Sequence, residues 1–173
     1  MQTVLTFFTQ LSLQKIIMAI KIGQQAPGFS LYDTAKNKVN LSDYKGKNVL
    51  LLFFPQAFTS TCTKELCTVR DDINRYSNAS AEILGISVDS VFTLKKYKED
   101  QQYSFTLLSD FNKEVSALYD TLYTDWILDM KGVSKRSAFI IDKNGIIQYA
   151  EVLEKAGDLP NFEAINATLE QLK

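Results

Sequence analysis

The stretch "NVLLLFFPQAFTSTCTKELC", residues 48–67, places an apolar run directly before a proline, a group of hydroxyl side chains and both cysteines of the chain. Continuous runs such as "NVLLLFF" are typical of a strand buried on both faces. Farther on, apolar residues recur at helical spacing from about Ser60 to Tyr76, namely Leu66, Val69, Ile73 and Tyr76. The stretch therefore predicts a central strand, a loop and a helix that packs on the sheet.

Cys62 lies four residues before Leu66, so it shares the apolar face of this helix and falls in its first turn. Unpaired backbone N–H groups and the positive end of the helix dipole favour an anion at that place. Cys62 is thus positioned to be a thiolate. A free cysteine is also among the most buried residue types and often only fills space. Position alone leaves both interpretations open.

Outside this stretch the sequence predicts strands and helices in alternation. "FSLYD" and "KVNLSDY" indicate an extended pair around a turn, and "EILGISV" and "FTLLS" indicate strands. The segments "VFTLKKYKEDQQ", "KEVSALYD" and "NFEAINATLEQLK" indicate helices. "SAFIIDKNGIIQYAEV" predicts a hairpin in which Asn144 and Gly145 supply positive backbone angles. The expected fold is α/β, a mixed sheet flanked by helices.

The chain has 173 residues, 46% of them hydrophobic, which is the length and composition of one compact domain. We expect this domain to cover residues 18–173. The preceding "MQTVLTFFTQLSLQKII", residues 1–17, is predicted to lie outside it as an extension. Its alternatives are an amphipathic surface helix or a diverged targeting segment. Its lysine follows the apolar stretch, unlike in a secretory signal, and it is too short and too polar to span a bilayer.

Charge and residue counts exclude several kinds of site. A formal net charge of −1 lacks the broad attraction that phosphate backbones and anionic membranes require, so neither nucleic acid nor a membrane is an expected partner. With two cysteines and no histidine the chain cannot supply the usual four zinc ligands. The missing histidine also rules out a cysteine–histidine nucleophile. We expect no metal and no cofactor.

The spacing Pro55, Thr59, Cys62 forms PxxxTxxC after a buried strand, which resembles the peroxiredoxin active-site signature. The resemblance extends along nearly the whole chain from Met18, through "GQQAPGFSLYD", "GISVDS" and "KRSAFIIDKNGIIQY". It is closest to the alkyl hydroperoxide reductase E and bacterioferritin comigratory groups. It implies a thioredoxin-like sheet with an N-terminal β-hairpin extension, and a thiol-dependent peroxidase that reduces hydrogen peroxide and organic hydroperoxides.

The resemblance also implies a role for each matching residue. Cys62 would be the peroxidatic cysteine, with Thr59 hydrogen-bonding the thiolate and the peroxide. Arg136 would stabilise the thiolate and the leaving oxygen, and Pro55 would shield the site. Glu65 would hold an arginine in place. Cys67 would resolve Cys62 through an intrachain disulfide, although some relatives work with one cysteine and an external thiol.

Each of these residues also has a structural interpretation. Thr59 could be a helix cap, Pro55 a strand terminator, Arg136 an exposed edge residue and Glu65 a solvated charge. Lys135 is the rival cation beside Arg136. The helical spacing places Cys67 toward the solvent side, near Arg70 and Asp71.

Two other classes of function compete with a peroxidase. A thiol–disulfide oxidoreductase of the thioredoxin type would normally show CxxC and a later proline near the site, but no proline lies between Pro55 and Pro160. A non-enzymatic binding protein on the same fold would leave the joint spacing of Pro55, Thr59 and Cys62 unexplained. The peroxidase interpretation implies a thioredoxin-like or glutaredoxin-like reductant, a cytoplasmic location and a monomer or homodimer.

Overall fold

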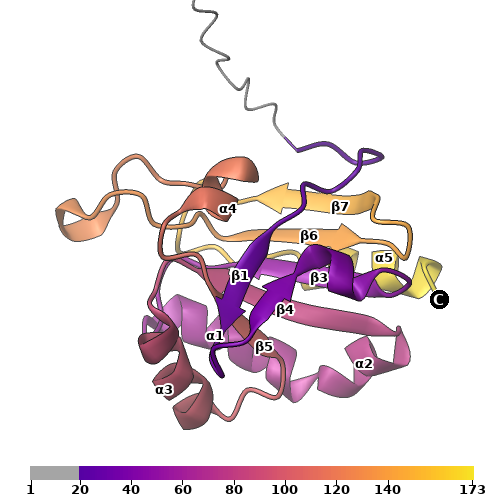
Figure 1. Ribbon diagram of the computed structural model, residues 1–173, viewed down its shortest axis with the longest axis horizontal. Coiled ribbons are helices and arrows are strands. Elements are labelled where there is room, and N and C mark those ends of the chain that lie inside the picture. Colours follow the sequence, from indigo (N-terminus) through magenta and orange to yellow (C-terminus); the bar gives the residue numbers. More distant parts are fainter. Residues whose placement is uncertain (1–19) are drawn as a thin grey trace, which may run out of the picture.

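The computed structural model describes residues 20–173, which form a mixed sheet with helices on both faces (Figure 1). Its seven strands are β1 (Ser30–Asp33), β2 (Lys38–Asn40), β3 (Asn48–Phe53), β4 (Ala81–Ser87), β5 (Thr106–Ser109), β6 (Ser137–Ile141) and β7 (Ile147–Val152). The α-helices are α1 (Ser60–Asp71), α2 (Ile73–Asn78), α3 (Val91–Gln101), α4 (Glu114–Leu118) and α5 (Phe162–Gln171). Two 3-10 helices are η1 (Leu41–Tyr44) and η2 (Ile127–Asp129).

The strand order is β2-β1-β5-β4-β3-β6-β7. Strands β3, β4 and β5 run parallel to one another, whereas the β1–β2 hairpin pairs with β5 and the β6–β7 hairpin pairs with β3 in the antiparallel sense. This arrangement confirms the predicted thioredoxin-like α/β fold with its N-terminal hairpin. It also places β3, the strand that leads to Cys62, in the interior of the sheet between β4 and β6.

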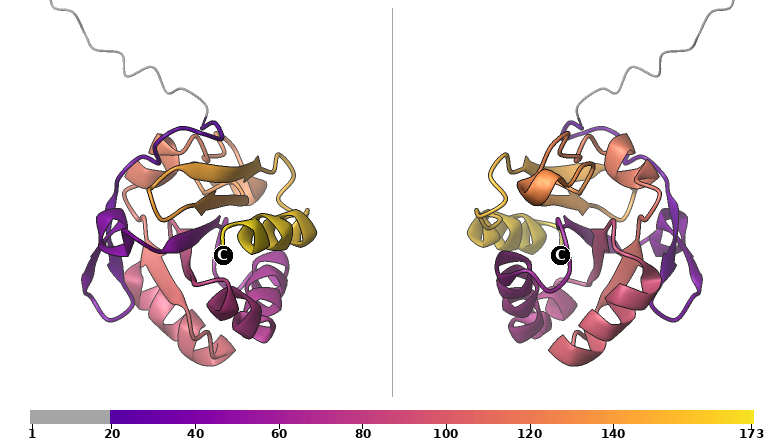
Figure 2. Two further views of the ribbon diagram at one scale, coloured as in Figure 1. Left: turned by 90° about the vertical axis from the view of Figure 1, so that its right-hand side faces the viewer. Right: turned by 90° about the vertical axis from the view of Figure 1, so that its left-hand side faces the viewer.

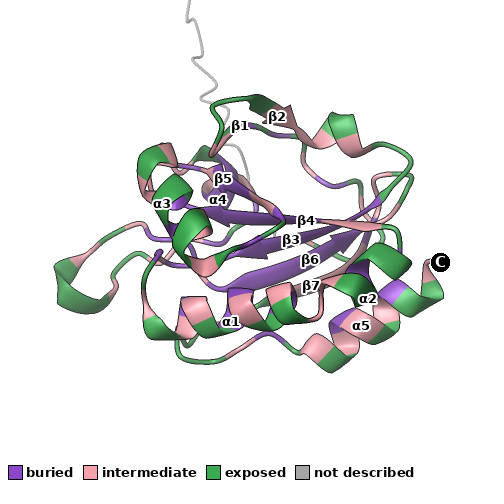
Figure 3. Cartoon of the chain, turned by 90° about the horizontal axis from the view of Figure 1, so that it is seen from below, coloured by how far each residue is buried: buried purple, intermediate pink, exposed green. Residues whose placement is uncertain are grey.

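The sheet divides the core into two apolar layers because side chains alternate along each strand. Leu50 and Leu52 of β3 face the layer under α1, α2, α3 and α5, while Val49 and Leu51 face the layer under α4 and the segment before β1. Figure 2 shows α1, α2 and α5 on one side of the sheet. In Figure 3 the inner strands β3, β4 and β6 are mostly buried, and exposed residues lie on the outer faces of the helices, in the loops and in the β1–β2 hairpin. The site helix α1 thus rests on the larger core.

The predicted helix over residues 60–76 is wrong in one respect, because it breaks at Asp72. This residue leaves the helical region at φ −106° and ψ 22°, and its carboxylate binds Arg75 at 3.1 Å. Aspartate disfavours helix interiors because its short carboxylate competes for nearby polar groups. The predicted strand "KVNLSDY" likewise ends early. Its last four residues form η1, where Asp43 accepts a hydrogen bond from the Asn40 backbone N–H at 2.8 Å.

The turn between β6 and β7 also differs from the prediction. Gly145 adopts the expected positive φ of 84°, but Asn144 is not among the residues with positive φ. The Asp142 carboxylate instead accepts hydrogen bonds from the N–H groups of Asn144 and Ile146, which closes the turn around one glycine. A Cβ on Gly145 would lie 2.3 Å from the end of the Gln25 side chain, so a larger residue here would have to displace that side chain as well as adopt a positive φ.

Residues 1–17, predicted to be an extension, lie outside the described residues, and the domain limit at residue 18 stays a prediction. Across residues 20–173, no helix combines the length and the apolar character needed to cross a membrane.

Candidate active site

The loop between β3 and α1 carries the site and is fastened to the neighbouring strand. Phe54 still donates a backbone hydrogen bond to Ile86 of β4, and the buried Pro55 follows. Phe58 adopts a positive φ of 64°, which turns the chain before Thr59 begins α1. Local extended structure up to Phe53 and helical structure from Ser60 therefore leave six residues to shape the site.

Cys62 is the third residue of α1 and is buried, with 1% of its surface exposed. The Arg136 guanidinium donates a hydrogen bond from Nη2 to the Cys62 Sγ at 3.4 Å. The thiol therefore meets both a helix N-terminus and a permanent cation in a place shielded from water. A helix N-terminus and a guanidinium both interact favourably with negative charge.

Arg136 reaches this place because β6 pairs with β3. Ser137 lies opposite Phe53 in the antiparallel register. The preceding Arg136 therefore lies beside the end of β3, where the site loop begins. Its Nη1 donates to Glu65 Oε2 and its Nη2 also donates to the Ala156 carbonyl oxygen at 3.0 Å. Arg136 and Glu65 are both buried. We call Cys62, Glu65 and Arg136 the Cys62 cluster.

The neighbouring Lys135 lies outside this cluster. Its Nζ binds the exposed carboxylate of Glu154 at 2.8 Å. Successive residues of an extended segment point to opposite sides, which explains why one cation is buried and the other is not. Of the two candidate cations, the structure brings Arg136 to the thiol.

Burial strongly affects the ionisation of the pair. It raises the pKa of Glu65 from its ordinary 4.5 to about 7, although the nearby Arg136 opposes this rise. Burial also disfavours the charge on Arg136, but Glu65 and Cys62 outweigh it and raise the pKa of Arg136. The guanidinium thus stays charged while Glu65 exchanges its proton near neutral pH.

This shift predicts how Glu65→Gln changes stability with pH. A raised carboxyl pKa contributes stability that is complete below 4.5 and is lost as pH rises through about 7. Relative to Glu65→Gln, the wild type should lose up to about 3 kcal/mol of unfolding free energy between pH 4 and pH 8. Urea titrations of both proteins at several pH values measure this difference. A wild type that gains stability over the variant as pH rises would show that pairing with Arg136 outweighs burial.

Thr59 occupies the N-cap position of α1, but its side chain makes no capping hydrogen bond. Its hydroxyl donates to the Gln56 carbonyl oxygen at 3.0 Å instead of to the Cys62 thiol. The structure therefore places Thr59 in the site loop without the predicted bond to sulfur. Because its proton is engaged by Gln56, the hydroxyl remains an acceptor for a donor that enters the site.

Cys67 lies on α1 five residues beyond Cys62 and is the more exposed of the two, as predicted, but it does not face open solvent. It is half-buried and packs against the core beside the end of α3. Its Sγ lies 3.7 Å from Gln101 Oε1 and 3.9 Å from the Tyr103 hydroxyl. The reason is that α3 and the following residues cover this side of α1, which helical spacing cannot reveal. Both cysteines are free thiols.

Asp89 is a residue of the site that sequence reasoning missed. Its Oδ2 accepts hydrogen bonds from the Ala57 backbone N–H and from the Ser87 hydroxyl, each at 2.8 Å. It thus fastens the site loop to the end of β4. Its signal in the sequence was its position directly after a predicted buried strand, where polar side chains of an α/β sheet gather.

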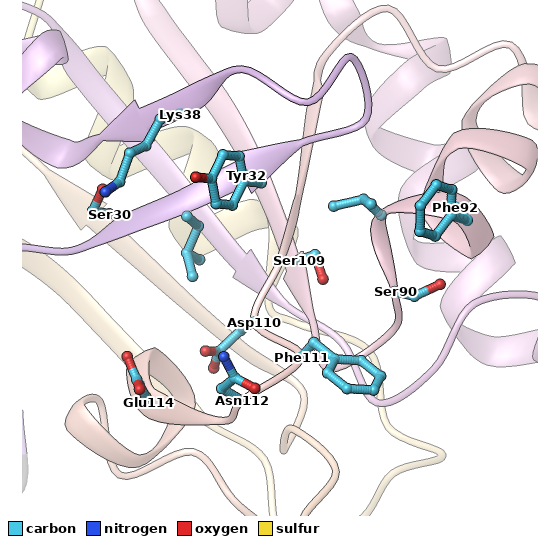
Figure 4. Close-up of a pocket in the computed structure, with 12 residues that line it drawn as sticks. Ser30, Tyr32, Lys38, Ser90, Phe92, Ser109, Asp110, Phe111, Asn112 and Glu114 are labelled. Carbon is cyan, nitrogen blue, oxygen red and sulfur yellow. The ribbon is translucent and has the colours of Figure 1, made fainter.

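A pocket of about 470 Å³ lies apart from the Cys62 cluster (Figure 4). It is lined by the β1–β2 hairpin, the start of α3 and the residues after β5, including Tyr32, Phe92 and Phe111. No member of the Cys62 cluster lines it. Within residues 20–173 no group of three or more histidine, cysteine or acidic side chains is arranged to hold a metal ion.

Comparison with known proteins gives a consistent result. The sequence profile of the AhpC/TSA family matches residues 22–150. The chain is 34% identical over 167 residues to the mitochondrial thioredoxin-dependent peroxide reductase of Drosophila melanogaster, covering 91% of this chain and 68% of the relative. It is 37% identical over 146 residues to the chloroplastic 2-cysteine peroxiredoxin of Chattonella marina var. antiqua, covering 78% and 72%.

A solved structure agrees with these relatives. The crystal structure of peroxidoxin BcpB from Mycobacterium tuberculosis superposes with a TM-score of 0.79 at 29% identity, covering 89% of this chain and 99% of that one. The family match spans the whole Cys62 cluster. Fold and relatives together define a thiol-dependent peroxidase. The chain belongs to the AhpC/TSA family and is a peroxiredoxin.

Proposed function

We propose that this protein reduces hydroperoxides through Cys62 and that Cys67 regenerates the oxidised enzyme within the same chain. The observation that carries the first part is the contact between the Arg136 guanidinium and the Cys62 sulfur at the buried N-terminus of α1. It supplies a stabilised nucleophile and, in the same place, donors for a developing oxyanion.

In the first step the Cys62 thiolate attacks the terminal oxygen of the hydroperoxide. The O–O bond breaks, sulfur is oxidised by two electrons to a sulfenic acid, and the departing oxygen takes up a proton to leave as water or an alcohol. Arg136 donates hydrogen bonds to the peroxide oxygens, and the Thr59 hydroxyl oxygen accepts a hydrogen bond from the hydroperoxide O–H, whose hydrogen stays on the oxygen that is transferred to sulfur. Pro55 excludes bulk water, and Glu65 positions the guanidinium.

The second step requires α1 to change shape. Residues five apart in a helix have Cα atoms roughly 8.7 Å apart, whereas a disulfide needs less than about 7 Å. Both cysteines lie in α1 between Ser60 and Asp71. We infer that the first turns unwind after oxidation. The Cys67 sulfur then attacks the sulfenic sulfur, an S–S bond forms, and the hydroxyl group leaves as water with the thiol proton.

A dithiol reductant completes the cycle by thiol–disulfide exchange. The name of the Drosophila relative supports a thioredoxin-like donor, and a glutaredoxin-like donor has the same chemistry. We place the enzyme in the cytoplasm as a monomer or homodimer. The alternative within the same class is a one-cysteine peroxidase, in which an external thiol reduces the sulfenic acid directly.

Peptide mapping after one equivalent of peroxide tests this route. The expected product is an intrachain Cys62–Cys67 disulfide with both thiols consumed, while Cys67→Ser should stop at a sulfenic acid on Cys62. A wild-type protein that keeps a stable sulfenic acid beside a free Cys67 would favour the one-cysteine alternative. So would a Cys67→Ser variant that turns over at the full rate with thioredoxin as its only reductant.

A further inference from the structure

Helix α1 is fastened to α3 and the residues after it by Tyr97 and Tyr103, which we call the tyrosine pair. Both rings are buried, and they meet edge to face with centroids 5.3 Å apart. The Tyr97 hydroxyl shares a hydrogen bond of 3.0 Å with the Thr63 hydroxyl. The Tyr103 hydroxyl lies 3.9 Å from the Cys67 sulfur. The tyrosine pair therefore contacts α1 at Thr63, the residue after Cys62, and at Cys67 itself.

Further contacts extend this attachment to both sides. The Phe58 ring, in the site loop, packs on Tyr97 with centroids 4.9 Å apart. At the other end Arg70 Nη1 donates to the Gln101 backbone oxygen at 2.8 Å. The helix that must unwind for disulfide formation is thus held to α3 and the residues after it at Thr63, Cys67 and Arg70.

The contacts between the tyrosine pair and α1 affect disulfide formation but not the oxidation of Cys62. Neither tyrosine hydroxyl forms a hydrogen bond with the Cys62 sulfur, which Arg136 contacts from β6. Attack on peroxide uses the folded helix and leaves these bonds intact. Bringing Cys67 to Cys62 must break the bond between Tyr97 and Thr63 and withdraw Cys67 from Tyr103.

We propose that the tyrosine pair is a positioning element that keeps α1 folded and so sets the rate at which Cys67 reaches the sulfenic acid. This proposal rests on the resolving role of Cys67 given above. It has a chemical consequence, because a sulfenic acid that waits can react with a second peroxide and become a sulfinic acid. The strength of the attachment then determines how readily excess peroxide inactivates the enzyme.

Tyr97→Phe is the sharpest test, because it keeps the packed ring and removes one hydroxyl. A single hydrogen bond of this kind corresponds to about a two- to tenfold change in an equilibrium. We expect disulfide formation and hydrogen exchange of the α1 amides to accelerate by about that factor. The rate of Cys62 oxidation should stay unchanged, and less sulfinic acid should form per turnover.

Thr63→Val removes the other partner of the same hydrogen bond, so it should accelerate disulfide formation as much as Tyr97→Phe does. The double variant should accelerate it no further than either single variant. Tyr149→Phe is the matched control. Tyr149 packs against the same core, but its hydroxyl donates to Glu151 in β7 and not to α1. It should leave both the exchange of α1 and the rate of disulfide formation as in the wild type.

The outcomes separate the two proposals. If the wild type forms no Cys62–Cys67 disulfide, the resolving role fails and this inference fails with it. If the disulfide forms but Tyr97→Phe matches Tyr149→Phe in its rate and in α1 exchange, only the role of the tyrosine pair is wrong. A Tyr97→Phe variant that slows Cys62 oxidation as much as it alters resolution would also contradict that role.

Discussion

Cys62→Ser is expected to abolish peroxide reduction and leave the fold intact. A serine hydroxyl has nearly the shape of the thiol but does not ionise at neutral pH, so neither Arg136 nor the helix end can turn it into an anionic nucleophile. Peroxide consumption with excess thiol reductant should fall to the uncatalysed rate. Circular dichroism and the melting temperature verify that the buried site still folds.

Cys67→Ser is the matched control for this prediction. It removes the other thiol from the same helix, yet the first oxidation of Cys62 should proceed at the wild-type rate in a single turnover. A Cys62→Ser variant that retains peroxidase activity would show that Cys62 is not the nucleophile. Equal loss of the first oxidation in both variants would point to a structural effect on α1.

Arg136→Met should slow Cys62 oxidation by about 10²- to 10³-fold, the loss that follows removal of one preorganised donor to a developing oxyanion. Stopped-flow measurement of the first oxidation at several peroxide concentrations gives this rate directly. Lys135→Met offers a control at the adjacent position, because Lys135 pairs with the exposed Glu154. It should change the rate by less than about twofold.

Arg136→Met is also expected to lower the free energy of unfolding, because it would leave Glu65 buried without its cation. Breaking a buried pair on one side commonly costs about 3–5 kcal/mol. The double variant Glu65→Gln/Arg136→Met removes both charges and should recover much of this stability without recovering the rate. Recovery of the rate in the double variant would contradict a direct role for the guanidinium at the sulfur.

Much of the fold could be predicted because its signals are local. The buried run at β3, the alternation of strands and helices and the placement of Cys62 in the first turn of α1 all follow from spacing within one segment. The sequence-based prediction was wrong at places where a single residue changes the backbone conformation. Asp72 breaks a helix that the apolar spacing continues, and Asp142 closes a turn with one positive φ rather than two.

The position of the nucleophile on its helix follows from the amino-acid sequence, because a period of 3.6 residues and a helix N-terminus depend on neighbours in the chain alone. The groups that surround the nucleophile depend on how distant segments pack. Glu65 and Arg136 are 71 residues apart and meet because β6 pairs with β3 in one register. Cys67 lies against Tyr103, 36 residues later in the sequence, because α3 packs beside α1. Such contacts depend on the order of the strands and the packing of the layers, and the spacing of apolar residues within one segment cannot predict either.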